Sequence, residues 1–168
     1  MKNELYLCSI DPKYLKYMHK IDYRVSVKFN NRPFVGVIVM LNGMEYVIPL
    51  TSQTTAEREK EGKKKRSSLI TTFIRDTKGN EIADLLHNNM IPVKLGVYSV
   101  LNINATKETY EANEIRFIRK HKDNIIRKAQ KVHDDRILKH STFLLKTCCD
   151  FLKLEKACND YSSETGQN

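Results

Sequence analysis

The sequence predicts an α+β fold: a twisted, mainly antiparallel sheet, with long C-terminal helices packed on it. Short β-favouring runs separated by turn signals fill the chain up to Ile103. From about Glu108, apolar side chains recur with a helical period instead of a period of two. With 168 residues and 40% hydrophobic content, the chain can bury one core. We expect a single domain over residues 1–158 and a polar, disordered tail over residues 159–168.

The first predicted elements are a strand and a short helix. Residues 4–10 are rich in β-favouring side chains. Asp11 followed by Pro12 is typical of an N-cap and a first helical position, so we expect a helix from Pro12 to about His19.

A β-hairpin is the clearest local signal. Apolar runs at residues 34–41 and 44–50 flank Asn42-Gly43. Both central positions of a two-residue hairpin turn need positive φ, which Asn and Gly tolerate best. The sequence therefore predicts two antiparallel strands joined at this pair.

A charged segment interrupts the strands. Residues 57–68 carry six basic and three acidic side chains without an apolar anchor, which indicates an exposed loop. The later strands are predicted at residues 69–74, 82–86, 90–93 and 97–103, with a turn at 78–80. Pro92 favours a sheet edge or a strand start.

The C-terminal third has the pattern of two helices. Ile115, Ile118, Ile125 and Ala129 share one helical face, and Asp134 is predicted to cap a second helix. The residues spaced for burial in that second helix are Ile137, Leu138, Leu144, Leu145, Cys148, Phe151 and Leu152.

Charge favours a polyanionic partner. Lys and Arg number 29 against 20 Asp and Glu, a formal charge of +9. No apolar run approaches the roughly 18 residues that span a bilayer, and the polar N-terminus does not resemble a signal peptide. We therefore expect a cytoplasmic protein without a membrane partner. The four cysteines lack metal-ligand spacing, so we expect reduced thiols, no metal and no cofactor.

The basic residues form two patches, one at residues 63–66 and one on the helical segment after Asn113. A solvated helix face could explain the second patch alone, but the two together favour phosphate contacts along an RNA. The predicted RNA-binding residues are Phe29, Asn31, Lys63, Lys64, Lys65, Arg66, Arg116, Arg119 and Lys120.

The candidate site for chemistry is the segment Pro49-Leu50-Thr51-Ser52, where the second hairpin strand ends. No glycine-rich phosphate loop, HExxH motif or acidic two-metal constellation is present. Arg32 precedes the first hairpin strand, so hairpin closure brings it to the same end of the sheet as Thr51 and Ser52. A cation beside two hydroxyls can bind a phosphate, whereas the alternative role for such hydroxyls is turn capping.

Several of these segments together resemble the ToxN/AbiQ family, the endoribonuclease toxins of type III toxin–antitoxin systems, with CptN-type toxins as the nearest branch. The similarity covers roughly residues 4–150. It rests on the run at 34–39, the Asn-Gly-Met-Glu-Tyr return, Pro49-Leu50-Thr51-Ser52, Met90-Ile91-Pro92 and residues 116–119.

The resemblance implies a barrel-like ribonuclease-toxin core and metal-independent RNA cleavage in abortive infection, a form of phage defence. It also implies an antitoxin RNA of repeated pseudoknots that the toxin processes and binds in a closed protein–RNA ring, with cellular mRNA as the substrate. Ser52 and Thr51 would line the active site, with Arg32 where relatives usually carry lysine. Relatives often follow the Thr-Ser pair with proline and lysine, whereas this chain has Gln53 and Thr54.

A metal-free ribonuclease uses the 2′-hydroxyl of the RNA as nucleophile and leaves 2′,3′-cyclic phosphate and 5′-hydroxyl ends. We expect Ser52 and Thr51 to bind the scissile phosphate and the 2′-hydroxyl, and Arg32 and Lys28 to stabilise developing charge. Two other functions stay open from the sequence. One is a noncatalytic RNA-binding module, and the other is a protein-binding antitoxin or scaffold.

Overall fold

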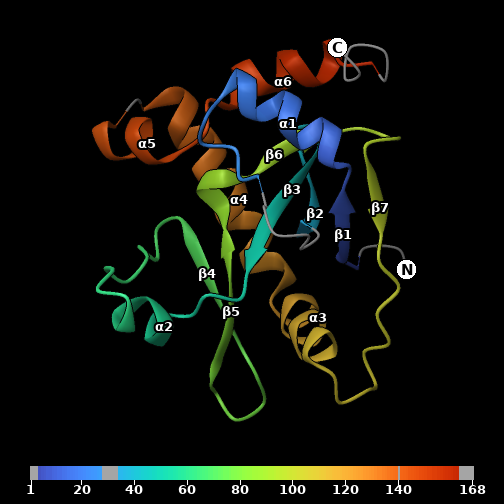
Figure 1. Ribbon diagram of the computed structural model, residues 1–168, viewed down its shortest axis with the longest axis vertical. Coiled ribbons are helices and arrows are strands. Elements are labelled where there is room, and N and C mark those ends of the chain that lie inside the picture. Colours follow the sequence, from blue (N-terminus) through green and yellow to red (C-terminus); the bar gives the residue numbers. More distant parts are fainter. Residues whose placement is uncertain (1–3, 28–33, 140, 163–168) are drawn as a thin grey trace.

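The computed structural model describes residues 4–27, 34–139 and 141–162 and shows an α+β fold, as predicted (Figure 1). The strands are β1 (Tyr6–Ile10), β2 (Val35–Leu41), β3 (Met44–Thr51), β4 (Thr71–Arg75), β5 (Glu81–Leu86), β6 (Ile91–Val93) and β7 (Tyr98–Val100). The helices are α1 (Pro12–Ile21), α2 (Thr55–Lys60), α3 (Tyr110–Lys120), α4 (Lys122–Leu138), α5 (Thr142–Thr147) and α6 (Phe151–Asp160), with a 3₁₀ turn at His87–Asn89.

The sheet is built around the long strand β3. Its strand order is β4-β5-β3-β2-β1-β7, and every pairing is antiparallel. One edge of β3 pairs with β2, while its other edge pairs first with β6 and then with β5. The described strands run from β4 to β7 without closing, so the barrel implied by the resemblance is an open sheet.

The hairpin of β2 and β3 is confirmed, with Asn42 at φ 53° and Gly43 at φ 80°. Near its open end, Gly36 pairs with Pro49. A Cβ added at Gly36 would lie 2.4 Å from Val47 Cγ1 and 2.6 Å from the Ile48 carbonyl oxygen. The two strands therefore approach this closely only because position 36 has no side chain.

Helices α1 and α6 pack together beside the sheet (Figure 1). Asp11 caps α1 as predicted, accepting from the Lys13 amide at 3.0 Å. Tyr14 is fully buried, and its ring centroid lies 4.9 Å from that of Tyr161. Helix α6 thus continues into the segment predicted as tail. Residues 163–168 lie outside the described ranges.

Two expectations for the charged and helical segments were wrong. Residues 57–68 are not a loop throughout, because α2 begins in a capping box. The Thr54 hydroxyl accepts from the Glu57 amide, and the Glu57 carboxylate accepts from the Thr54 amide. Asp134 lies inside α4 and caps nothing, since the first helical segment instead breaks at His121.

The chain after α4 forms two short helices, capped by Ser141 and Asp150, in place of one continuous helix. The apolar side chains of this segment therefore do not all lie on one face of a continuous helix. As a result Leu138, Leu145 and Leu152, which were predicted to be buried, are exposed. Across the described ranges, no helix combines the length and the apolar character that crossing a bilayer requires.

Candidate active site at the end of strand β3

The two candidate hydroxyls lie where the chain passes from β3 into α2. Thr51 is the last residue of β3 and pairs with Asp84 of β5. Ser52 follows it and is exposed, whereas Thr51 is half-buried. The Thr51 hydroxyl accepts from the Gln53 amide at 3.3 Å, so this threonine also shapes the turn. The Ser52 side chain is left at the surface, with no part in the core.

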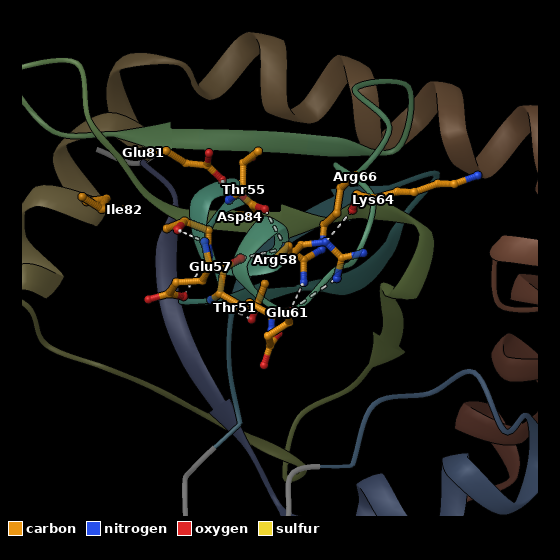
Figure 2. Close-up of polar contacts among 12 residues, drawn as sticks. Thr51, Thr55, Glu57, Arg58, Glu61, Lys64, Arg66, Glu81, Ile82 and Asp84 are labelled. Atoms are coloured by element: carbon orange, nitrogen blue, oxygen red, sulfur yellow. Dashed lines mark hydrogen bonds and ion pairs between the residues drawn. The ribbon is translucent and has the colours of Figure 1, made fainter.

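Arg66 holds this turn in place (Figure 2). Its Nη1 donates to the Gln53 carbonyl at 2.7 Å and to Asp84 Oδ2 at 2.8 Å. Its Nη2 donates to Gln53 Oε1 at 3.2 Å. The Arg66 side chain is only 15% exposed, so the prediction of an exposed loop fails at this residue.

The side chain of Gln53 is bound from two further directions. Arg58 of α2 donates from Nη1 to Gln53 Oε1 at 3.3 Å and from Nε to the Lys64 carbonyl at 2.9 Å. The side-chain nitrogen Nε2 of Gln53 donates to the Glu61 carboxylate. Gln53 and Arg58 were not among the predicted site residues, although the Thr54-x-x-Glu57 capping box that begins the helix of Arg58 is readable in the sequence.

Asp84 is the buried anchor of this cluster. Its side chain has no exposed surface, and burial raises its pKa to about 7, helped by the neighbouring Glu81 and opposed by Arg66. Glu81 accepts from the Thr55 amide at 3.0 Å. Although burial raises the pKa of Glu81, hydrogen bonds from Asp84 and Thr55 lower it overall. The pair therefore favours a proton on Asp84 and a charge on Glu81 below neutral pH.

The other predicted catalytic residues, Lys28 and Arg32, lie outside the described residues, as do Phe29 and Asn31. Within the described chain, the guanidinium of Arg66 contacts the Thr51–Gln53 turn through Gln53. Lys63, Lys64 and Lys65 precede it and are exposed. Lys65 lies over the Phe73 ring at 5.2 Å, while Lys63 lies 3.3 Å from Glu61. Three exposed lysines thus occupy the segment that leads to Arg66.

The predicted basic residues of α3 differ from one another in their contacts. Arg116 donates to the carbonyls of Ala105 and Lys107, so it fixes the segment that precedes α3. Arg119 donates to the Leu5 carbonyl at 3.2 Å. Lys120 is exposed, and the described residues offer it no hydrogen bond or ion pair.

Neither metal ligation nor thiol chemistry has a visible basis in the described ranges. No three His, Cys, Asp or Glu side chains converge there as a metal-binding group would. All four cysteines are buried and free, and burial raises the pKa of Cys8 and Cys149 to about 12.

Comparison with known proteins gives consistent results. A family model described as "Toxin ToxN, type III toxin-antitoxin system" matches residues 6–159. Endoribonuclease ToxN of Bacillus thuringiensis subsp. kurstaki is 29% identical, with 91% of this chain and 82% of the relative covered. Endoribonuclease AbiQ of Lactococcus lactis subsp. lactis is 27% identical, with 94% and 89% covered.

A solved structure shares the whole fold. It belongs to a study of bacterial type III systems in which a non-coding RNA pseudoknot selectively inhibits the toxin. The two chains are 27% identical with a TM-score of 0.78, covering 96% of this chain and 99% of the other.

Proposed function

This chain belongs to the ToxN family of toxins from type III toxin–antitoxin systems, and on that basis we propose that it is an endoribonuclease that cuts RNA at the end of strand β3. The observation that carries this placement is the turn at Thr51–Gln53. Two hydroxyls stand at a strand end that Arg66, Arg58 and Asp84 hold rigidly, although Ser52 adds nothing to the core.

The proposed reaction is an internal transesterification. The 2′-oxygen of the RNA bonds to the adjacent phosphorus and loses its proton, while the bond from phosphorus to the 5′-oxygen breaks and that oxygen gains a proton. The products carry a 2′,3′-cyclic phosphate and a 5′-hydroxyl. No metal ion enters the reaction, so the protein must orient the attack and stabilise the charge on the phosphate.

Ser52 and Thr51 serve as hydrogen-bonding groups in this proposal. An unassisted hydroxyl is too weakly acidic to remove the 2′-proton, but it can donate to a phosphate oxygen. Lys28 and Arg32 supply positive charge toward the same phosphate. The exposed Lys63, Lys64 and Lys65 attract the RNA backbone into the site.

Asp84 and Arg66 act as positioning residues in this proposal. Although the pKa of Asp84 lies near neutrality, its side chain is fully buried and cannot reach a substrate. Arg66 joins it to the Gln53 carbonyl and so fixes the orientation of the residue just after Ser52. Hydrogen bonds from such supporting residues determine how precisely a catalytic side chain is positioned.

The same proposal covers the partners. An antitoxin RNA of repeated pseudoknots inhibits the protein, is processed by it and joins it in a closed ring in the cytoplasm. Cellular mRNA is the substrate once the antitoxin is lost, as part of a defence against phage. The pseudoknot inhibition described for the structural relative supports the RNA partner.

The deciding experiment incubates the purified protein with RNA in the presence of EDTA. We expect defined fragments with cyclic phosphate ends. Binding without fragments would replace the enzyme with a noncatalytic RNA-binding module. Cleavage that stops with EDTA and returns with magnesium would remove the metal-free mechanism.

A further inference from the structure

A hollow lies away from the Thr51–Gln53 turn, between the tip of the β4–β5 hairpin and the C-terminal end of α3. Its volume is about 440 Å³, within the usual range of small-ligand pockets. Arg75 and Gly79 line it from the hairpin, and Phe117, Lys120 and His121 line it from the end of α3. We call this hollow the α3 pocket. Figure 1 shows α3 beside the lower part of that hairpin.

The aromatic wall of the α3 pocket suits a flat ring. The rings of Phe117 and His121 lie with centroids 4.1 Å apart and an interplanar angle of 34°. Both side chains are half-buried, so part of each ring remains accessible. Aromatic side chains in this arrangement offer a stacking surface for an unpaired base.

The charges around the pocket favour a phosphate beside that ring. Lys120 and Arg75 are both exposed, and Lys120 has no partner among the described residues. The acidic group in the pocket wall, Asp76, accepts from the Lys78 and Asn80 amides at 2.9 and 3.0 Å. Its charge is thus directed into the hairpin turn, and the positive charge of the pocket prevails.

We propose that the α3 pocket binds one unpaired nucleotide of an RNA, with the base on Phe117 and His121 and the phosphate at Lys120 and Arg75. This inference rests on the proposed function because it takes RNA as the partner. It adds a contact beyond the predicted RNA-binding residues, which do not include Phe117, His121 or Arg75.

The pocket is separate from the proposed cleavage site. Thr51 pairs with Asp84, whereas Arg75 and Gly79 lie at the other end of the same hairpin. From Asp84 to Gly79 the chain covers roughly 15 Å. Only an RNA that reaches both places gains from the pocket, so its contribution to affinity depends on the length of the RNA.

The test uses two RNA probes, a long and a short random-sequence pool. Binding of the long pool is measured in a Ser52→Ala background, which prevents cleavage. Phe117→Leu should weaken it by about tenfold, the usual effect of losing one stacked base. Lys120→Ala should lower the slope of log affinity against log salt by about 0.7 to 0.9. Cleavage of the short pool by Phe117→Leu with Ser52 intact should match wild type.

Lys153→Ala is the matched control, because Lys153 is an exposed lysine of α6, at the opposite end of the molecule from α3 (Figure 1). It should leave long-RNA affinity and its salt slope unchanged. Equal affinities for wild type, Phe117→Leu and Lys120→Ala would overturn the proposal, as would a parallel loss of short-RNA cleavage in Phe117→Leu. Melting curves establish that each variant folds. A wild-type protein that cuts no RNA at all would refute the proposed function instead.

Discussion

Arg66 and Asp84 form an ion pair of 2.8 Å across 18 residues of sequence, and the same guanidinium nitrogen donates to the Gln53 carbonyl. One side chain therefore connects the segment after α2, strand β5 and the turn that carries Ser52. Asp84 is fully buried and pairs with Thr51, so the contacts that hold the turn are buried while Ser52 is exposed to solvent.

Ser52→Ala should abolish RNA cleavage and toxicity while leaving the fold intact. Removing one exposed hydroxyl should cost at most about 1 kcal/mol of unfolding free energy. Losing one oriented contact to the transition state can lower the rate by about 100-fold or more. The measurements are cleavage of one defined RNA, RNA affinity and melting temperature.

Ser99→Ala provides the control, since Ser99 is an exposed serine in β7. It should cut at the wild-type rate. If Ser52→Ala also melts and cuts as wild type does, Ser52 is a turn residue and the mechanism must be sought elsewhere.

Arg66→Gln should destabilise the protein and slow cleavage without removing a catalytic group. Leaving Asp84 buried without its cation should cost about 2 kcal/mol or more, moderated by protonation of Asp84. The double variant Arg66→Gln/Asp84→Asn should lose less than the sum of the single losses, by about 1 kcal/mol. For cleavage, kcat should fall about tenfold while KM changes little, because the turn is misplaced. Strict additivity in stability would show that the pair is not coupled.

A triple change of Lys63, Lys64 and Lys65 to glutamate should weaken RNA binding and make the affinity less dependent on salt. Each lost phosphate contact should lower the slope of log affinity against log salt by about 0.7 to 0.9. Arg66 is left unchanged because it supports the turn. An unaltered slope would mean that these lysines are only a solvated segment.

Gly36→Ala should destabilise the fold by about 1 to 3 kcal/mol or more, because its Cβ would overlap Val47 and the Ile48 carbonyl. The clash would displace β3, which ends at Thr51, so cleavage should fall as well. Met40→Ala, at an exposed position of the same strand, should change the unfolding free energy little. Denaturant titrations of both variants test this, and a Gly36→Ala protein as stable as wild type would contradict the close approach.

Acid should destabilise the protein through His87. This imidazole is fully buried and its Nε2 lies 2.8 Å from the Thr72 hydroxyl. Burial, with Lys128 nearby, lowers its pKa to about 3. Stability from the neutral ring is thus complete above the unfolded pKa of about 6.5 and is lost as the pH falls toward 3.

Asp84 acts in the opposite direction. Its raised pKa stabilises the fold below about pH 4, and this stabilisation is lost as the pH rises through about 7. The two effects are separated by comparing variants with wild type at several pH values. His87→Gln should show a shallower loss of stability between about pH 6.5 and 4, and Asp84→Asn a shallower loss between about pH 4 and 7. Profiles parallel to wild type would contradict these assignments.

Local signals predicted the elements that depend on neighbouring residues. Asn42-Gly43 formed its turn and Asp11-Pro12 opened its helix because turn geometry and capping are decided within a few residues. The charged run at 57–68 predicted an exposed loop, because charged side chains without an apolar anchor favour solvent. The Thr54–Glu57 capping box, which indicates a helix start, is the signal that corresponds to α2.

The candidate site was predictable only in part, because some of its contacts join residues that are distant in the sequence. The strand end at Thr51-Ser52 followed from the hairpin. The inward direction of Arg66 did not, since it depends on Asp84, a distant residue of another strand. An acidic residue within the apolar run Ile82-Ala83-Asp84-Leu85-Leu86 was the one readable sign that a buried cation would be needed.

The packing of α1 against α6 also determines when the protein can finish folding. Tyr14 can enter its ring contact with Tyr161 only after the intervening strands and helices have been synthesised. During translation the apolar face of α1 must wait uncovered, and β6 likewise lacks the helix that packs on it. The α1 and β6 surfaces therefore become covered only once α6 has been synthesised, so this part of the molecule cannot fold before its C-terminal helix is present.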